Sequence, residues 1–213
     1  MEYSALIVAA GSGTRMGLGY NKVYAPMADG TLILEKTVNV FMADPDCAQI
    51  VVVTDPLEFR HHFTNRFPGK IVLCKGGKTR QESVCNGLRA VMCDIFFVHD
   101  GARPFVSQKN LNDLKQAMEK EDGAILAVPC KDTIKRVENG YAAETYDRST
   151  LVNVQTPQCF KTSLLIDCLE KAVMDGFTGT DDASLVEKYS DTKVRIVEGS
   201  YENIKITTPS DLK

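Results

Sequence analysis

Apolar, β-branched runs alternate with segments of helical character along most of this sequence. The runs occupy residues 5–10, 50–54, 71–74, 95–98, 124–128 and 194–197. Helices are expected between most of them, around residues 32–43, 56–66, 79–92 and 107–120. Strands that alternate with helices pair in parallel, because each helix carries the chain back across the sheet. The alternation predicts an α/β fold, with a Rossmann-like, mostly parallel sheet and helices on both faces.

One region, residues 131–150, interrupts this alternation. It reads as two short polar strands around Asn139-Gly140, and an Asn-Gly pair is a strong signal for a hairpin turn. A hairpin this polar does not suit a buried sheet, so we expect a projecting arm that docks on a second subunit. With no repeat, low-complexity tract or linker, residues 1–213 are expected to form one domain that carries this arm.

The charge balance narrows the classes of ligand. A net charge of −3 argues against a general nucleic-acid binder, because non-specific binding to phosphate backbones needs a basic surface. A small anionic ligand needs only a local basic pocket and stays possible. No apolar run approaches the roughly 20 residues that span a bilayer, and no secretion signal is evident. The seven cysteines are scattered without a C-x-x-C pair, which favours a reducing, cytoplasmic location.

A glycine-rich turn follows the first apolar run, in the stretch "LIVAAGSGTRMG" at residues 6–17. Its glycines, Gly11 and Gly13, let backbone N–H groups approach an anion closely. The dinucleotide fingerprint G-x-G-x-x-G needs glycine at position 16, which is Met16. The P-loop pattern is absent as well. Neither standard explanation of such a turn fits the spacing.

Two cations lie close to this turn in the sequence, Arg15 and Lys22. Two cations beside a glycine turn suit a triphosphate better than the pyrophosphate of a dinucleotide. The alternative at this point is two solvated surface residues.

A carboxylate ends the apolar strand in "FFVHDGARP", residues 96–104. Asp100 would stand at the carboxyl end of a central strand, where a Mg²⁺ ion bound to phosphates is held in open α/β sheets. The alternative is a turn cap. The adjacent His99 is expected to be a packed, hydrogen-bonded histidine rather than a catalytic base.

A second glycine loop stands in "GGKTRQESVCNGL", residues 76–88. Gly76 and Gly77 follow an apolar run, and a helix is expected to begin near Thr79. Backbone groups here could line a pocket for a base, with the Ser83 hydroxyl facing the base edge. A simple loop before a helix explains the same residues almost as well.

Three further stretches say little when each is taken alone. They are "TPQ" at residues 156–158, "TGTDDASLVEK" at 178–188 and "ENIKITTPSDL" at 202–212. In the second, Thr180 and Asp181 resemble a helix N-cap and first turn. In the third, an apolar strand is expected to carry Lys205.

Taken together, the order and spacing of these stretches are specific. The chain resembles the nucleotidyltransferases that activate sugar and polyol phosphates, and most closely the 2-C-methyl-D-erythritol 4-phosphate cytidylyltransferases. The resemblance runs nearly end to end. It is carried by "AAGSGTRMG", "GGKTRQESVCNGL", "VHDGARP", "KDTIK", "DRSTLVNVQTPQCF", "TDDASL" and "NIKITTPSDL".

The resemblance implies a reaction and a set of site residues. CMP would pass from CTP to 2-C-methyl-D-erythritol 4-phosphate with release of pyrophosphate, a step of isoprenoid precursor synthesis, in a Mg²⁺-dependent homodimeric enzyme. The implied catalytic cations are Arg15, Lys22 and Lys205. The implied nucleotide-binding residues are Ala9, Ala10, Gly11, Gly13, Gly76, Gly77, Arg80, Ser83 and Asp100, with Asp100 also holding Mg²⁺. The implied acceptor-binding residues are Gly101, Arg103, Thr133, Arg148, Thr156 and Lys205, with Arg148 reaching the site of the partner subunit.

The sequence departs from the family pattern at two positions, and it leaves two alternative functions. Asn21 precedes Lys22 where the family often has proline, and Gly101 replaces a common alanine. Ribitol 5-phosphate cytidylyltransferases share most of these motifs, so ribitol 5-phosphate is the alternative acceptor. A nicotinamide-dependent oxidoreductase is a more remote alternative, and the misplaced third glycine counts against it.

Overall fold

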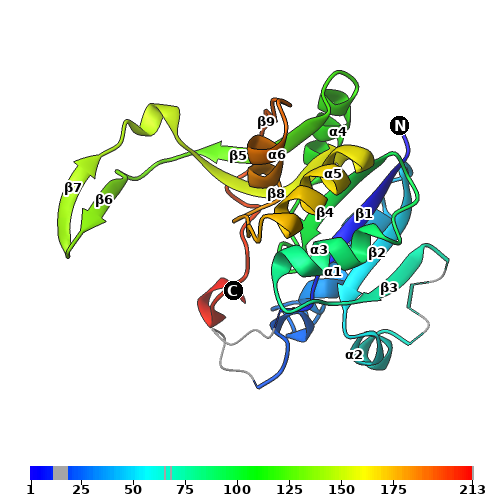
Figure 1. The fold of residues 1–213 in the computed structure, drawn as a ribbon. Coiled ribbons are helices and arrows are strands. Elements are labelled where there is room, and N and C mark those ends of the chain that lie inside the picture. The colour runs from blue at the N-terminus through cyan, green and yellow to red at the C-terminus, as the bar shows by residue number, and fades with distance from the viewer. Residues whose placement is uncertain (12–18, 65, 68, 213) are drawn as a thin grey trace.

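The central feature of the fold is one seven-stranded sheet, seen in a computed structural model that describes residues 1–11, 19–64, 66–67 and 69–212. The strand order is β3-β2-β1-β4-β8-β5-β9 (Figure 1). The strands are β1 (Tyr3–Val8), β2 (Cys47–Thr54), β3 (Ile71–Lys75), β4 (Ile95–Asp100), β5 (Gly123–Pro129), β8 (Val152–Lys161) and β9 (Arg195–Glu198). Only β8 runs antiparallel to its neighbours, β4 and β5. The expected α/β fold with a mostly parallel sheet is confirmed.

Helices cover both faces of this sheet, as its buried apolar strands require. One buried apolar cluster joins the sheet to α1 (Ile33–Met42), α2 (Pro56–His62) and α4 (Gln108–Met118). A second cluster, on the opposite face, joins it to α3 (Arg80–Leu88), α5 (Thr162–Met174) and α6 (Ala183–Tyr189). Successive side chains of a strand point to opposite faces, so Ile7 enters the first cluster and Leu6 the second.

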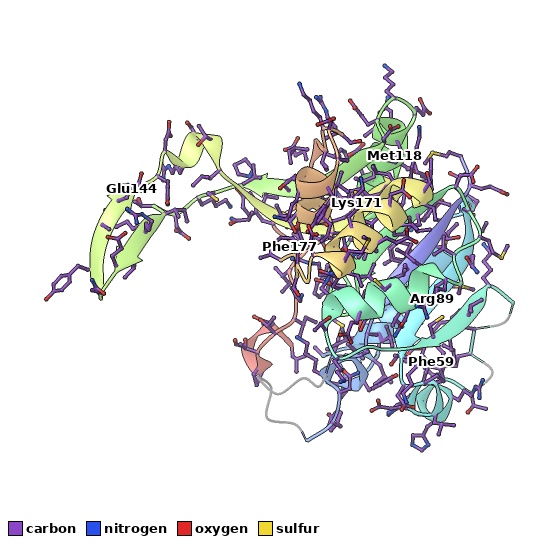
Figure 2. The ribbon with its side chains drawn as sticks, in the orientation of Figure 1. Phe59, Arg89, Met118, Glu144, Lys171 and Phe177 are labelled. Atoms are coloured by element: carbon purple, nitrogen blue, oxygen red, sulfur yellow. The ribbon has the colours of Figure 1, made fainter. Side chains whose placement is uncertain are left out.

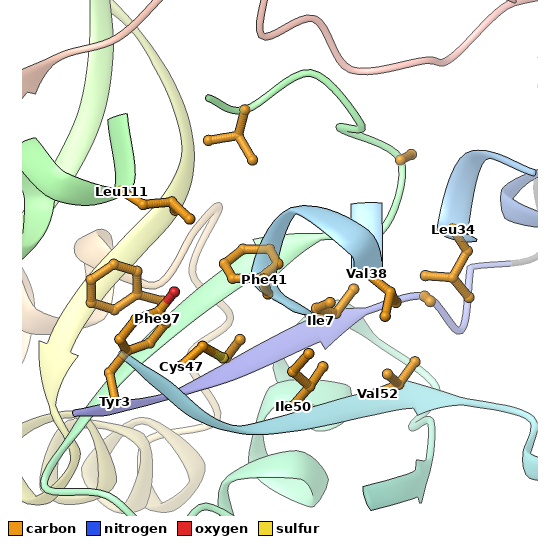
Figure 3. Close-up of a cluster of buried hydrophobic side chains, with 14 of the residues drawn as sticks. Tyr3, Ile7, Leu34, Val38, Phe41, Cys47, Ile50, Val52, Phe97 and Leu111 are labelled. Atoms are coloured by element: carbon orange, nitrogen blue, oxygen red, sulfur yellow. The ribbon is translucent and has the colours of Figure 1, made fainter. Parts of the chain in front are cut away.

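The first cluster contains several of the largest fully buried side chains, from the sheet and from α1. Figure 3 shows Tyr3, Phe41 and Phe97 gathered above β1 and β2. The rings of Tyr3 and Phe97 stack with their centroids 4.1 Å apart. The Tyr3 hydroxyl donates to Asp44 Oδ2 at 2.9 Å, which satisfies the one polar atom of this ring pair. The sheet is therefore a rigid base for the loops at its edge.

The polar hairpin is present and stands apart from the sheet. Strands β6 (Lys135–Glu138) and β7 (Tyr141–Thr145) form a separate two-stranded sheet whose residues are all exposed. Its turn has positive φ at Asn139 (49°) and Gly140 (85°), as a type I′ hairpin requires. Figure 1 shows this arm extending well away from the body, and Figure 2 places Glu144 on it, far from Arg89 and Phe177.

Several element bounds differ from the expectation. The expected helices at 56–66 and 79–92 end earlier, at His62 and Leu88. The strand β8 and the helix α5 were not expected at all. The segment around Lys205 is not the expected strand: its backbone joins the fold through a hydrogen bond from the Ile206 N–H to the Ala102 carbonyl, at 2.8 Å.

The helix after "TGTD" also begins later than expected. Asp182 is the N-cap residue of α6, rather than Thr180 or Asp181. The Asp181 side chain nonetheless caps this end, because its Oδ1 accepts the Ser184 N–H at 3.0 Å. None of the described helices is both long enough and apolar enough to cross a membrane.

Candidate functional site

A cavity of about 430 Å³ opens at the carboxyl ends of β1 and β4, where open α/β sheets bind ligands. The turn after β1, the 3₁₀ helix η2 (Lys22–Tyr24) and the start of α3 form its walls. It brings together most of the residues implied for nucleotide binding. These are Ala9, Ala10, Gly11, Gly77, Arg80, Ser83 and Asp100, and the implied catalytic cations Lys22 and Lys205 line the same cavity. The implied Gly13 and Arg15 lie outside the described residues.

Asp100 ends β4, and three cationic side chains surround its carboxylate. Lys205 Nζ lies 2.7 Å from Oδ2, and Arg103 Nε lies 3.7 Å from the same oxygen. Arg80 Nε lies 3.4 Å from Oδ1. Burial alone would raise the pKa of Asp100, but the three cations outweigh it and hold the pKa well below its usual range. The cavity therefore has a permanent carboxylate in an otherwise basic wall.

Arg80 connects this carboxylate to a second one. Its Nη1 lies 2.8 Å from Oδ2 of Asp182, as a close ion pair rather than a well-aligned hydrogen bond. Burial would lower the pKa of Arg80, but Asp182 and Asp100 raise it instead. Arg80 therefore stays positively charged, and Asp182, the N-cap residue of α6, holds its side chain in place.

Arg103 and Lys205 are placed by one extended segment. Arg103 Nη1 donates to the Asn203 carbonyl at 2.7 Å, and Asn203 Nδ2 donates to the Thr156 carbonyl at 2.9 Å. Lys205 lies between Asn203 and the anchored Ile206. Arg103 Nε is buried with no hydrogen-bond acceptor among the described residues, and burial lowers the pKa of this guanidinium. This nitrogen faces Asp100 Oδ2 across 3.7 Å, so the guanidinium is held against the carboxylate as a charge partner.

His99 and Thr156 support Asp100 from behind. His99 is buried, its Nε2 lies 2.9 Å from the Arg103 carbonyl, and its Nδ1 lies 3.0 Å from Thr156 Oγ1. Since a carbonyl only accepts, Nε2 carries the proton and Nδ1 accepts from the threonine. Thr156 Oγ1 in turn accepts the Asp100 N–H at 3.0 Å. Burial lowers the pKa of His99 to about 4, so the ring is neutral, as expected of a packed histidine.

The loop after β3 forms the opposite wall. Ser83 Oγ accepts the Gly77 N–H at 3.0 Å and donates to the Thr79 carbonyl at 2.9 Å. Thr79 is the N-cap residue of α3, so this helix begins where the sequence predicts. A Cβ on Gly76 would lie 2.1 Å from the Cβ of Ala10, so the two loops touch through a glycine. Ser83 therefore shapes the loop as well as facing the cavity.

Two implied residues use their backbone groups inside the protein. The Ala9 N–H donates to the Val53 carbonyl at 2.8 Å, and the Ala9 carbonyl accepts from Asn21 Nδ2 at 2.6 Å. The Gly101 N–H donates to the Val8 carbonyl at 2.9 Å, and its own carbonyl accepts from Thr37. Both residues are buried, and these bonds link the ends of β1, β2 and β4 to their neighbours, so the four backbone groups are already used within the protein.

Of the implied acceptor residues, Lys205 lines the cavity, whereas Gly101, Arg103, Thr133, Arg148 and Thr156 do not. Thr156 lies behind Asp100, as described above. Thr133 and Arg148 are exposed on the arm, and Arg148 Nη1 donates to the Lys131 carbonyl at 2.8 Å. Within this chain, the geometry gives these two residues no contact with the Asp100 cluster.

Sequence reasoning missed Asp182, Asn203 and the structural contact of Asn21. Asp182 and Asn203 stand inside the stretches "TDDASL" and "NIKITTPSDL", but both look like ordinary turn residues. What distinguishes both residues is visible only in the fold, which buries their polar side chains completely. In the sequence, Asn21 stands out only because the family often has proline at this position.

The donor set fits a magnesium ion that arrives with phosphates. No cluster of three or more potential metal-ligating side chains occurs among the described residues. Of the described residues that line the cavity, Asp100 is the one with a carboxylate. Mg²⁺ is commonly held by one or two carboxylates with the remaining positions filled by substrate phosphates and water. A free ion would meet three cations around Asp100, which disfavours binding without a polyanion.

Comparisons with known proteins agree with this geometry. The profile of one family, described as "IspD: 2-C-methyl-D-erythritol 4-phosphate cytidylyltransferase", matches residues 3–213. A protein of that name from Bacillus velezensis is 46% identical over 218 residues, covering 100% of this chain and 93% of its own length. Another from Geobacillus thermodenitrificans is 45% identical over 217 residues, covering 100% and 94%.

Solved structures show the same likeness. The 4-diphosphocytidyl-2C-methyl-D-erythritol synthase of Anaerococcus prevotii superposes with a TM-score of 0.85 at 33% identity, covering 99% of this chain and 94% of that one. The 2-C-methyl-D-erythritol 4-phosphate cytidylyltransferase of Thermus thermophilus gives 0.81 at 33% identity, covering 100% and 96%. From its sequence match and its fold, the chain belongs to the 2-C-methyl-D-erythritol 4-phosphate cytidylyltransferase family.

Proposed function

We propose that this protein transfers CMP from CTP to 2-C-methyl-D-erythritol 4-phosphate and releases pyrophosphate, a step of isoprenoid precursor synthesis. Membership of the family along nearly the whole chain supports the reaction. The observation that supports the site is the carboxylate of Asp100 with Arg80, Arg103 and Lys205 around it. Asp100, Arg80 and Lys205 line the cavity at the carboxyl ends of β1 and β4.

The reaction suits a cavity that is rich in cations and has no catalytic base. A phosphate oxygen of the acceptor attacks the α-phosphorus of CTP, and the bond from that phosphorus to the pyrophosphate oxygen breaks. The acceptor phosphate is already ionised near neutral pH, because its second pKa is about 6. No proton needs to be removed, which agrees with the neutral, buried state of His99. The requirement is instead to bring two anions together and to stabilise the charge of the transition state.

The residues divide this work by position. Arg15 and Lys22, at the glycine turn, neutralise the triphosphate. Ser83 and the Gly76–Gly77 loop face the cytosine. Arg103 and Lys205 bind the acceptor phosphate: Lys205 lines the cavity, and Arg103 pairs with Asp100 beside it. Asp100 holds Mg²⁺, which supplies charge neutralisation at the phosphates when bound.

The acceptor site is completed by a second copy of the chain. Arg148 and Thr133 lie on the arm, away from the cavity of their own chain. The arm exposes apolar side chains at its tip, with Val137 65% and Tyr141 78% accessible, which favours docking on another surface. We infer a homodimer in which the arm of each subunit brings Arg148 to the other subunit's acceptor. All seven cysteines are free, in keeping with a cytoplasmic location.

Pyrophosphate release tests the reaction and the acceptor together. CTP with 2-C-methyl-D-erythritol 4-phosphate should give Mg²⁺-dependent release, whereas ATP, or CTP without acceptor, should give little. Excess chelator should stop the reaction. Faster turnover with ribitol 5-phosphate would assign the other acceptor, and equal turnover with ATP would refute a cytidylyltransferase.

A further inference from the structure

We propose that Asn21 is a positioning residue for Lys22, because its side chain ties the segment that carries this lysine to the carboxyl end of β1. The inference rests on the proposed function, in which Lys22 neutralises the phosphates of CTP. Asn21 and Lys22 are adjacent in the chain and line the same cavity.

The oxygen and the nitrogen of the Asn21 side-chain amide form hydrogen bonds to two different segments. Nδ2 donates to the carbonyl of Ala9 at 2.6 Å, and Oδ1 accepts the N–H of Val23 at 3.3 Å. The first bond reaches back over 12 residues to the end of β1, and the second starts the 3₁₀ helix η2. An asparagine side chain supplies a donor and an acceptor in one plane, whereas ionised aspartate only accepts. Serine can cap a helix but is too short to reach Ala9 as well.

A second anchor lies on the other side of Lys22. The buried Tyr24 shares a hydrogen bond with Thr54 Oγ1 at 2.9 Å, at the end of β2, and its ring stacks on His62 at 4.4 Å. The Ala25 N–H donates to the carbonyl of Lys22 itself at 2.9 Å. The backbone of Lys22 is therefore held from both sides, at the ends of two neighbouring strands.

This double anchoring matters because lysine is a compact charge on a flexible stem. The structure fixes where that stem starts, and so which phosphate oxygens the ammonium can reach. A shift of about 1 Å in a positioned group can cost on the order of a hundredfold in rate. The Tyr24 anchor would persist without Asn21, so the expected effect of losing the amide is a misplaced Lys22 in a folded protein.

Two substitutions and a double variant test this role. Asn21→Ser should lower kcat roughly tenfold or more while the KM for CTP changes little, because the displaced charge acts in the transition state. Asn21→Asp should show a similar loss of kcat and also weaken CTP binding, since it puts a carboxylate near the phosphates. In a Lys22→Ala background, Asn21→Ser should cost nothing further, because residues that act as a unit are not additive.

A readout independent of turnover separates this inference from the proposed function. Amide hydrogen exchange across residues 19–25 should be faster in Asn21→Ser than in the parent protein. Ser107→Ala is the matched control: it loses the cap bond to the Asn110 N–H, at 3.1 Å, outside the cavity, and should change neither exchange in this segment nor kcat. Unchanged exchange, or fully additive losses in the double variant, would overturn the role of Asn21. Failure of the parent protein to use CTP would refute the proposed function, while the exchange measurement would still decide whether the anchor exists.

Discussion

Three cationic side chains surround the carboxylate of Asp100, so even a change that keeps its size alters the local charge. The sequence could place Asp100 at the end of a strand and could place cations near it in the chain. It could not bring Arg80 and Lys205, which are separated by most of the fold, to opposite oxygens of one carboxylate. That arrangement depends on α3 and on the segment anchored at Asn203.

Asp100→Asn is expected to lower turnover by about a hundredfold, which corresponds to about 3 kcal/mol of lost charge stabilisation. Pyrophosphate release as a function of Mg²⁺ concentration measures this loss. CTP binding in metal-free buffer should be retained or tightened, because the three cations are no longer paired with a carboxylate. Near-normal turnover at limiting Mg²⁺ would reduce Asp100 to a turn cap.

Arg15→Ala and Lys22→Ala should each lower kcat more than they weaken CTP binding. Both cations are assigned to charge that grows as the pyrophosphate leaves, and only contacts that strengthen in the transition state speed the chemical step. Steady-state kinetics together with calorimetric titration of CTP separate the two effects. A higher KM with unchanged kcat would make them ground-state anchors.

The elements that the sequence predicts are those with one dominant local signal. The alternation of apolar runs gives the parallel strands, and Asn139-Gly140 gives the hairpin. Strand β8 has a weaker signal, because the alternation of "VNVQ" covers only four residues and is followed by "TPQ", which is polar and contains a proline. The strand predicted around Lys205 is also absent. Long-range hydrogen bonds of the neighbouring residues Asn203 and Ile206, rather than strand pairing, hold Lys205 in place.

Gly76, just after β3, lies against Ala10, just after β1, and this close contact leads to a further prediction. Gly76→Ala would place two Cβ atoms 2.1 Å apart, so the loops must separate. Overpacking of this kind typically costs about 1–3 kcal/mol. In the proposed function the displaced loop also faces the cytosine, so both thermal stability and CTP affinity should fall. Adding Ala10→Gly moves the methyl group from one loop to the other and should restore most of both. If the double variant is no better than Gly76→Ala, steric contact is not the cause.

At the scale of the whole molecule, the proposed docking of the arm makes each active site from two chains. In the proposed dimer, Lys22 of one subunit and Arg148 of the other serve the same site. Lys22→Ala and Arg148→Ala homodimers should therefore both be nearly inactive. After subunit exchange, about half of the dimers are mixed, and each mixed dimer has one intact site, so activity should recover to about a quarter of the parent value. Absence of recovery despite demonstrated exchange would place Arg148 outside the partner's site.

The arm leaves and re-enters the body at neighbouring positions of one ladder. β5 and β8 pair directly with each other up to Pro129 and Val152, and the Cys130 N–H donates to the Leu151 carbonyl at 3.2 Å just beyond them. The whole excursion is therefore an insertion at a hairpin, so its length and sequence can change without altering strand order or register. Natural variation or engineering could in this way exchange the assembly module while the nucleotide cavity keeps its scaffold.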